Sequence, residues 1–298
     1  RKIHCIGIGG IGVSALAKWY KFQGCIVSGS DIARSSITDD CAAAGIEIFE
    51  GHDPDHLHPD TDTVLYSDAA GEDNPEREEA RRRNIAEVSY AEALGEISRT
   101  KRTIAVTGTN GKSTTTAMIG VILEAAGFDP TVIVGSKVAS FPHGNLRLGR
   151  SDWLVVEADE YRDHMRHLAP EVIVLTNIEL DHTDYFHDVK QVEESFTRFA
   201  ASLRRSRAGV LVANLDNRAC ERIAEGARDF ARVVTFGAGM AADFLGRHRR
   251  SQSQRQYFEL FRRVSQEDMM GTVELQIPGE MNMYNALAAA SCAITLGV

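Results

Sequence analysis

The sequence lacks any run of the roughly 20 consecutive apolar residues that a helix needs to cross a bilayer. Its first residues lead directly into a predicted strand, without the layout of a signal peptide. Internal repeats and low-complexity tracts are also missing. We therefore expect a cytoplasmic globular protein that neither spans a membrane nor consists of repeats.

Cysteine is sparse, and its spacing excludes two kinds of site. The five cysteines are scattered over the chain: Cys5, Cys25, Cys41, Cys220 and Cys292. No two of them form a Cys-x-x-Cys pair, so nothing indicates a zinc site or a redox site. We predict that all five are reduced residues that serve packing.

An excess of positive charge is missing as well. The chain has 33 lysines and arginines against 42 acidic residues, a formal net charge of −9. This argues against binding to nucleic acids or membrane surfaces, since both require a basic surface. The basic run 247–250 is interpreted as a solvated turn. With 298 residues, 43% of them hydrophobic, the chain is long enough for two domains.

Short apolar runs alternate with helical patterns, which predicts an α/β fold with a mostly parallel sheet covered by helices. The predicted strands are 2–6, 26–28, 63–66, 85–88, 103–107, 131–134, 153–156, 172–175 and 209–213. The predicted helices are 13–22, 37–44, 91–97, 114–126, 192–203 and 285–296. A small antiparallel excursion is expected within 237–276. The polar stretch 98–102 divides two predicted domains, 1–98 and 103–298.

One glycine-rich loop carries the strongest functional signal. Thr107-Gly108-Thr109-Asn110-Gly111-Lys112-Ser113 lies between a predicted strand and a predicted helix. Consecutive backbone N–H groups and the positive end of the helix form a cradle for phosphate oxygens. We expect residues 108–114 to bind ATP, with Lys112 on the terminal phosphates and the Ser113 hydroxyl on Mg²⁺. The residues concerned are Gly108, Thr109, Asn110, Gly111, Lys112, Ser113 and Thr114.

Acidic and imidazole side chains follow two further predicted strands. Glu157 comes at the end of strand 153–156, and His182 lies in the segment after strand 172–175. Ligands of open parallel sheets bind beyond the carboxyl ends of the strands, so these residues are expected to converge on the ATP loop. Mg²⁺ usually takes phosphate oxygens and one or two protein ligands. Ser113, Glu157 and His182 are therefore the predicted metal ligands.

A second glycine loop, residues 7–12, follows the first predicted strand, and Asp31 ends the second. This is the pattern of a dinucleotide site, and a nicotinamide oxidoreductase is one reading of it. Because the chain also carries the Lys112 loop, we favour a diphosphate-bearing substrate here, held by Gly9, Gly10, Ile11 and Gly12, with ATP in the other loop.

Taken in order, the motifs resemble the Mur ligase family over essentially the whole chain. The matching segments are 4–17 with Ser28–Asp31, Ser67 with Asp73–Glu76, Thr107–Thr116, Glu157–Tyr161 with Asn177–His182, and Gly279–Asn285. The resemblance implies a Rossmann-like amino-terminal domain that binds a UDP-sugar, followed by a P-loop-type ATPase domain and then a carboxyl-terminal domain. It also implies adenine contacts from Asn282 and Asn285 and substrate contacts from Asp31, Ser35, Ser67 and Asn145.

The resemblance further implies the reaction. The match is strongest to those members that join L-alanine to the carboxylate of UDP-N-acetylmuramate in peptidoglycan precursor synthesis. In such a ligase ATP converts the carboxylate to an acyl phosphate, which the alanine amine attacks. Lys112, Glu157 and His182 are the implied catalytic residues, and ATP and Mg²⁺ are the implied cofactors.

The sequence departs from the family pattern at four places. Asn110 stands where the alanine-adding members usually have histidine, and Met281 stands where the adenine motif has histidine. Residues 195–199 contain no lysine that could carry the carbamate found in some later-acting members. Nothing in the sequence corresponds to the third domain, so we expect the chain to be inactive alone.

Three alternatives remain open from the sequence. The first is a ligase that joins a recycled peptide to the same UDP-sugar. The second is a nicotinamide oxidoreductase, and the third is a non-catalytic nucleotide-binding fragment.

Overall fold

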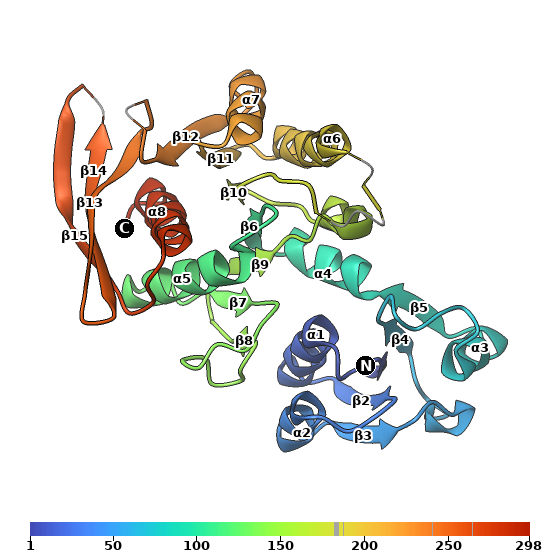
Figure 1. Cartoon of the computed structure of the whole chain (residues 1–298). Coiled ribbons are helices and arrows are strands. Elements are labelled where there is room, and N and C mark those ends of the chain that lie inside the picture. The colour runs from blue at the N-terminus through green and yellow to red at the C-terminus, as the bar shows by residue number, and fades with distance from the viewer. Residues whose placement is uncertain (182–184, 187, 240, 264) are drawn as a thin grey trace. The chain divides into compact units, whose positions relative to one another are not determined.

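The computed structural model describes residues 1–181, 185–186, 188–239, 241–263 and 265–298 (Figure 1). The chain forms two units, the first made of Arg1–Ile97 and Ile133–Leu148, the second of Ser98–Val132 and Gly149–Val298. The segment Ile133–Leu148, with the short strand β8 (Leu146–Arg147), thus groups with the first unit, whereas the sequence analysis placed it in the second domain.

The first unit contains a five-stranded parallel sheet in the order β3-β2-β1-β4-β5. Its strands are β1 (Lys2–Ile6), β2 (Ile26–Asp31), β3 (Glu47–Glu50), β4 (Thr63–Tyr66) and β5 (Ala86–Ser89). The helices are α1 (Ile11–Phe22), α2 (Ser36–Ala43), α3 (Pro75–Arg82), α4 (Tyr90–Arg99) and the 3-10 turn η1 (Pro54–His56). The order reverses between β1 and β4, which is where ligands bind in sheets of this kind.

The strand β3 and the helix α3 of this unit were not predicted from the sequence. β3 has only four residues, two of them glutamates, and pairs on one side only. α3 contains a single apolar residue, Ala80, so it has no hydrophobic periodicity to detect. Its start is instead set by Asn74, whose side chain accepts the N–H groups of Glu76 and Arg77, and by Pro75 in the first turn.

The sheet of the second unit runs in the order β15-β14-β13-β12-β11-β10-β6-β9-β7. Its parallel strands are β6 (Arg102–Thr107), β9 (Trp153–Glu157), β10 (Val172–Leu175), β11 (Val210–Asn214) and β12 (Arg232–Gly237), and β7 (Thr131–Ile133) lies beside β9. The helices are α5 (Lys112–Ala125), α6 (Val189–Ala200), α7 (Arg218–Ala227) and α8 (Glu280–Thr295), with 3-10 turns η2 (Tyr161–His167) and η3 (Ala201–Arg205). The predicted α/β class with mostly parallel sheets is confirmed; α7 and β12 were not predicted.

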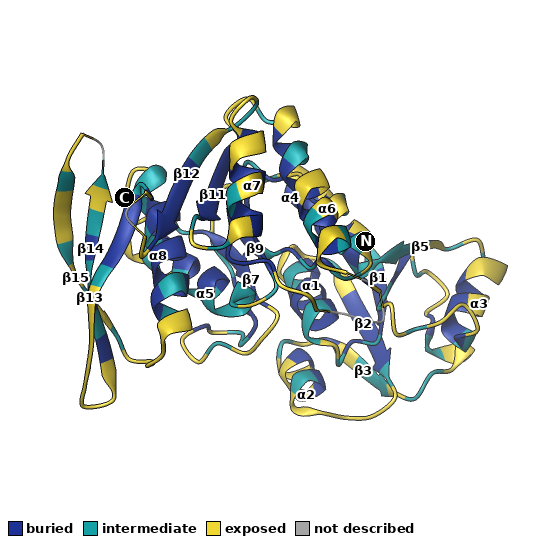
Figure 2. Ribbon diagram, turned by 45° about the horizontal axis from the view of Figure 1, so that its top comes forward, coloured by how far each residue is buried: buried dark blue, intermediate teal, exposed yellow. Residues whose placement is uncertain are grey.

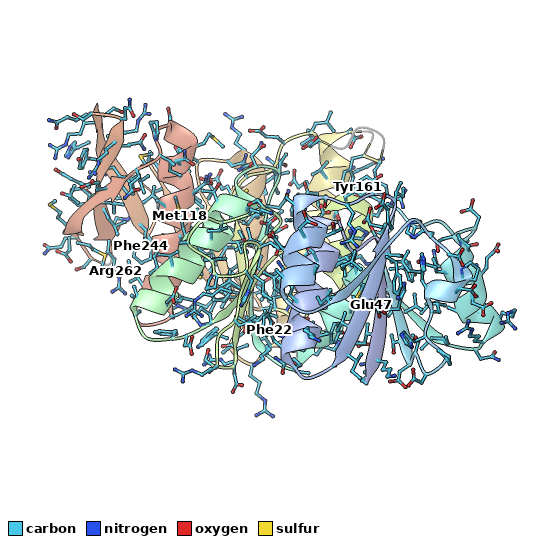
Figure 3. All side chains as sticks on the ribbon, turned by 90° about the horizontal axis from the view of Figure 1, so that it is seen from below. Phe22, Glu47, Met118, Tyr161, Phe244 and Arg262 are labelled. Atoms are coloured by element: carbon cyan, nitrogen blue, oxygen red, sulfur yellow. The ribbon has the colours of Figure 1, made fainter. Side chains whose placement is uncertain are left out.

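The antiparallel excursion consists of β13 (Phe244–Gln252), β14 (Arg255–Arg263) and β15 (Glu267–Leu275). The interpretation of residues 247–250 as a turn is wrong, because they lie within β13. Their charges made the strand look like a loop, yet cross-strand ion pairs accommodate them: Arg247 with Glu267 at 2.7 Å and His248 with Glu259 at 2.6 Å. Phe244 and Arg262 face each other across β13 and β14 (Figure 3).

The buried residues lie mainly on the central strands of each sheet and on the helix faces that cover them (Figure 2). All five cysteines are free thiols, and four of them are buried, Cys25 being the half-buried exception. In the described part of the chain, no helix combines the length and apolar character that a membrane span requires.

Candidate functional site

The Lys112 loop joins β6 to α5 at the carboxyl edge of the second sheet. β6 lies between β10 and β9, all three parallel, so the ends of these strands meet at one edge. Helix α5 begins at Lys112, and no side chain caps its first turn. The first N–H groups of a helix have no partner within it, so Lys112, Ser113 and Thr114 present backbone donors together with the positive end of the helix.

Two glycines of the loop are required by its backbone. Gly108 has φ +134°, and a Cβ there would overlap Thr176 Oγ1 and lie 2.8 Å from the Asn177 carbonyl oxygen. Gly111 has φ +83°, and its Cβ would overlap the Asn285 side-chain oxygen. The loop can therefore keep this shape only with glycine at both positions.

Asn177, two residues after the end of β10, holds the middle of the loop. Its carbonyl accepts the Thr109 N–H at 2.9 Å, and its side-chain oxygen accepts the Asn110 N–H at 2.9 Å. Its side-chain nitrogen donates to the Asn110 carbonyl at 2.8 Å. The sequence analysis noted Asn177 in a motif but gave it no role; its position at the end of a buried strand was the available signal.

Lys112 is held by a buried acid. Its Nζ donates to Glu160 at 2.9 Å and to the Gly108 carbonyl at 2.7 Å. Burial raises the pKa of Glu160, and the charge of Lys112 opposes that rise. Glu160, which was not singled out from the sequence, thus holds the ammonium group of Lys112 at the loop.

The predicted metal ligands are only partly described. Glu157 ends β9 opposite Val106 of β6, and Ser113 lies in the first turn of α5, so both belong to the edge that carries the loop. His182 lies outside the described residues. Among the described residues, no group of three or more His, Cys, Asp or Glu could hold a metal ion. A hydroxyl and a carboxylate are nonetheless the oxygen donors that Mg²⁺ prefers when phosphates supply its remaining ligands.

Asp159 adds negative charge to this edge. Burial raises its pKa, but the contact with His164, the Tyr161 N–H and the charge of Lys112 outweigh it, so that the pKa is lowered. The carboxylate therefore stays ionised at neutral pH near Lys112.

The predicted adenine residues lie at the start of α8. Asn285 is buried; its side-chain oxygen accepts the Thr115 hydroxyl at 3.3 Å, and its side-chain nitrogen donates to Asn282 at 3.3 Å. Asn285 therefore touches α5 directly behind Gly111, while Asn282 donates to the Pro278 carbonyl at 2.9 Å. Met281, in the histidine position of the family motif, is about half exposed.

The first glycine loop, residues 7–12, is held entirely by its own unit. The Ser30 carbonyl accepts the N–H groups of Gly7 and Ile8 at 2.9 and 3.0 Å. The Asp31 carboxylate accepts the Gly9 N–H at 2.7 Å. Ser67, after β4, lies against Gly7. The structure thus brings together Asp31, Ser67 and the loop at the carboxyl edge of the first sheet, where α1 begins.

Two other predicted substrate residues have structural tasks. Ser35 caps α2, accepting the N–H groups of Ile37 and Thr38 at 3.3 Å. Asn145 is buried, donates to the Ser14 hydroxyl at 2.9 Å and accepts from Lys18 at 2.5 Å. The sequence analysis missed Lys18, a buried lysine whose pKa is lowered by burial.

The comparison with known proteins agrees with this geometry. Residues 106–293 match the Mur ligase middle domain, and residues 2–102 match the Mur ligase family, catalytic domain. The chain belongs to the Mur ligase family. This Mur ligase chain is 41% identical to the UDP-N-acetylmuramate--L-alanine ligase of Salinibacter ruber over 98% of its own length and 60% of that protein.

Solved Mur ligase structures share the fold. The UDP-N-acetylmuramate-alanine ligase of Thermotoga maritima is 28% identical with a TM-score of 0.86, covering 100% of this chain and 65% of the other. The UDP-N-acetylmuramate:L-alanyl-gamma-D-glutamyl-meso-diaminopimelate ligase of Neisseria meningitides is 26% identical with a TM-score of 0.88, covering 100% and 94%. The present Mur ligase chain spans about 60% of the length of the first curated relatives it matches.

Proposed function

We propose that this chain supplies the UDP-sugar-binding and ATP-binding units of a cytoplasmic ligase that joins L-alanine to UDP-N-acetylmuramate. The observation that carries the proposal is the pair of glycine loops, each at the carboxyl edge of its own sheet, of which only the second contains a lysine. Two phosphate-bearing ligands fit two such loops. The identity to alanine-adding relatives, 41% in the Salinibacter ruber protein, selects the substrate.

In this proposal the Lys112 loop binds the triphosphate of ATP. The backbone donors of Lys112, Ser113 and Thr114 in the first turn of α5 meet the phosphates, and the Lys112 ammonium leaves Glu160 to neutralise the terminal phosphate. Asn282 and Asn285, which contact each other at the start of α8, would lie on the adenine side. Ser113, Glu157 and His182 would hold Mg²⁺, which would supply positive charge between two anions.

The proposed chemistry has two steps. A carboxylate oxygen of UDP-N-acetylmuramate attacks the terminal phosphorus, and the bond from that phosphorus to the ADP oxygen breaks. The amine of L-alanine then attacks the acyl carbon, loses a proton and releases inorganic phosphate. Positioning and charge neutralisation by Lys112 and the helix terminus are the protein's main contributions to the first step.

The first glycine loop would hold the diphosphate of the UDP-sugar. Ile11 and Gly12 offer backbone donors in the first turn of α1, whereas the N–H groups of Gly9 and Gly10 already donate to Asp31 and to the Gly7 carbonyl. Asp31 and Ser67 line the same edge. Ser35 and Asn145 would then act by fixing α2 and α1 instead of touching the ligand. The loop contains no cation, so backbone groups must supply most of the binding.

Titration calorimetry tests the proposal. The chain should bind UDP-N-acetylmuramate and ATP with Mg²⁺ independently, and should show no heat with NADH. Binding of NADH without binding of the UDP-sugar would favour the oxidoreductase reading and overturn the proposal.

A peptide-adding ligase is the second candidate, because the Neisseria meningitides structure covers this chain completely with a TM-score of 0.88. Both candidate ligases would bind the same UDP-sugar and ATP, so only the acceptor of the acyl group distinguishes them. The acceptor test compares L-alanine with the tripeptide L-alanyl-γ-D-glutamyl-diaminopimelate in a phosphate-release assay. Release with the tripeptide alone would replace the alanine assignment.

A further inference from the structure

In the first turn of helix α3, the side chain of one glutamate is buried in the interior of the first unit. Asn74 caps the helix, accepting the N–H of Glu76 at 3.0 Å and of Arg77 at 3.2 Å, and Pro75 occupies the first turn. Glu76 follows with a side chain that is 0% exposed. A buried carboxylate is costly unless hydrogen bonds compensate it, so its surroundings define its role.

The carboxylate of Glu76 gathers polar groups from four separate segments. It accepts the hydroxyl of Ser30 at the end of β2 and lies 2.8 Å from His56 Nδ1 in η1. His52 Nδ1, after β3, is 3.3 Å away, and His4 Nε2, in β1, is 3.6 Å away. His52 Nδ1 also lies 3.0 Å from the Ser30 hydroxyl oxygen, so His52 and Ser30 contact each other as well as Glu76.

Glu76 is ionised in this setting. Burial alone would raise its pKa, but the contacts of His4, Ser30 and His56 prevail and lower the pKa to about 2. Within the described residues these imidazoles and the carboxylate do not form a metal site. The hydroxyl and the imidazoles of this cluster therefore surround a single anion, the carboxylate of Glu76.

Ser30 connects this cluster to the first glycine loop. Its hydroxyl donates to Glu76, while its carbonyl accepts the N–H groups of both Gly7 and Ile8. The next residue, Asp31, accepts the N–H of Gly9. The N–H groups of three consecutive loop residues are thus fixed by Ser30 and Asp31 at the end of β2. Ser30 is held in turn by the carboxylate of Glu76.

We propose that Glu76 is a positioning residue for the substrate: it fixes Ser30, and through the Ser30 carbonyl it sets the loop of residues 7–12 to receive a nucleoside diphosphate. The identity of the ligand rests on the proposed function. The effect of Glu76 on the loop does not rest on that function, because the hydrogen bonds that link Glu76 to Ser30 and Ser30 to the loop amides need no ligand.

The test is Glu76→Gln, which keeps the shape and removes the charge. The dissociation constant for UDP-N-acetylmuramate should rise roughly 10-fold or more, as expected for hydrogen bonds to a charged group. The dissociation constant for ATP should stay unchanged. The matched control is Glu79→Gln on the same helix, whose carboxylate pairs with Arg82 at 2.6 Å and with Arg83, away from Ser30.

Hydrogen exchange of the Gly7, Ile8 and Gly9 amides separates this inference from the proposed function. These amides should exchange faster in Glu76→Gln than in the parent chain or in Glu79→Gln, without any ligand. If the parent chain binds no UDP-sugar but this difference appears, the proposed function fails and the positioning role stands.

Three results would overturn the inference. They are unchanged exchange of the loop amides in Glu76→Gln, an equal loss of ATP and UDP-sugar affinity, or an equal effect of Glu79→Gln. Should Glu76→Gln fail to fold, Ser30→Ala replaces it, because it removes only the hydroxyl that Glu76 accepts. Slower or unchanged exchange of the Gly7 and Ile8 amides in Ser30→Ala would then reject the link.

Discussion

The two glycine loops differ in the charge of the groups that hold their backbones. The loop of residues 7–12 is held by acids, Asp31 directly and Glu76 through Ser30, and contains no cation. The Lys112 loop is held by a neutral amide, Asn177, and carries a lysine that Glu160 keeps in place. Because the carboxylate supports of the first loop would repel a diphosphate, such a ligand must be bound there by backbone groups at the start of α1, whereas a triphosphate to be cleaved requires a mobile positive charge.

Gly108 of the Lys112 loop and Gly10 of the first loop differ in how tightly they are enclosed, and substitution of each should show this difference. Gly108→Ala places a methyl group against Thr176 and Asn177 at φ +134°, whereas Gly10→Ala meets only the Gly7 carbonyl, at 3.1 Å. We expect Gly108→Ala to destabilise the second unit by about 3 kcal/mol or more and to abolish ATP binding. Gly10→Ala should cost about 1 kcal/mol or less.

Urea unfolding followed by calorimetry with ATP measures both variants. If the two substitutions cost the same, Gly108 is not more constrained than Gly10, and the comparison of these two positions is wrong.

The lysine is the next difference. Lys112→Ala should weaken ATP binding about 100-fold, because it removes the cation that meets the terminal phosphate, and should leave UDP-N-acetylmuramate binding unchanged. Lys101→Ala is the matched control: Lys101 precedes β6 at its amino end and donates to the Ser151 carbonyl at 3.1 Å. Calorimetry with ATP and then with the UDP-sugar gives both affinities. Weakened binding of both ligands in Lys112→Ala would show that the loops do not act separately.

The acid supports of the first loop predict a pH effect confined to the first unit. The pKa of Glu76 falls from 4.5 to about 2 on folding. Its contribution to stability is therefore complete above about pH 4.5 and is lost as the pH falls toward 2, a difference of roughly 2–3 kcal/mol. The free-energy difference between the parent chain and Glu76→Gln should shrink over that interval. A constant difference from pH 6 to pH 2.5 in urea unfolding would contradict the ionised state.

The sequence predicted the loops better than their supports. A glycine loop between a strand and a helix is a local pattern, so Gly108, Lys112 and the sheet that carries them were identified. Asn177 and Glu160 act across strands that are neighbours only in the fold, and Glu76 acts on Ser30 across 46 positions. No local pattern encodes such partners. The buried contacts of Asn145 were missed for the same reason. The capping role of Ser35 is local, because the Ser35 hydroxyl accepts from Ile37 and Thr38, and the sequence pattern could have indicated it.

The smallest expected effect is on local opening of the two units, which each ligand should suppress only in the unit that binds it. Cys5 lies in β1, two residues before the first glycine loop, and Cys292 lies in α8, which begins with the predicted adenine residues. Both are fully buried, and burial raises the pKa of Cys292 to about 12, so either thiol reacts only when its surroundings open.

UDP-N-acetylmuramate should therefore slow alkylation of Cys5 several-fold and leave Cys292 unchanged, while ATP with Mg²⁺ should do the reverse. Iodoacetamide labelling followed by peptide mass spectrometry gives both rates in one experiment. The half-buried Cys25 serves as the internal reference, since its thiol reacts without opening of the core. Equal protection of Cys5 and Cys292 by either ligand would mean that the two units open together, and that the separate supports of the two loops do not make them energetically independent.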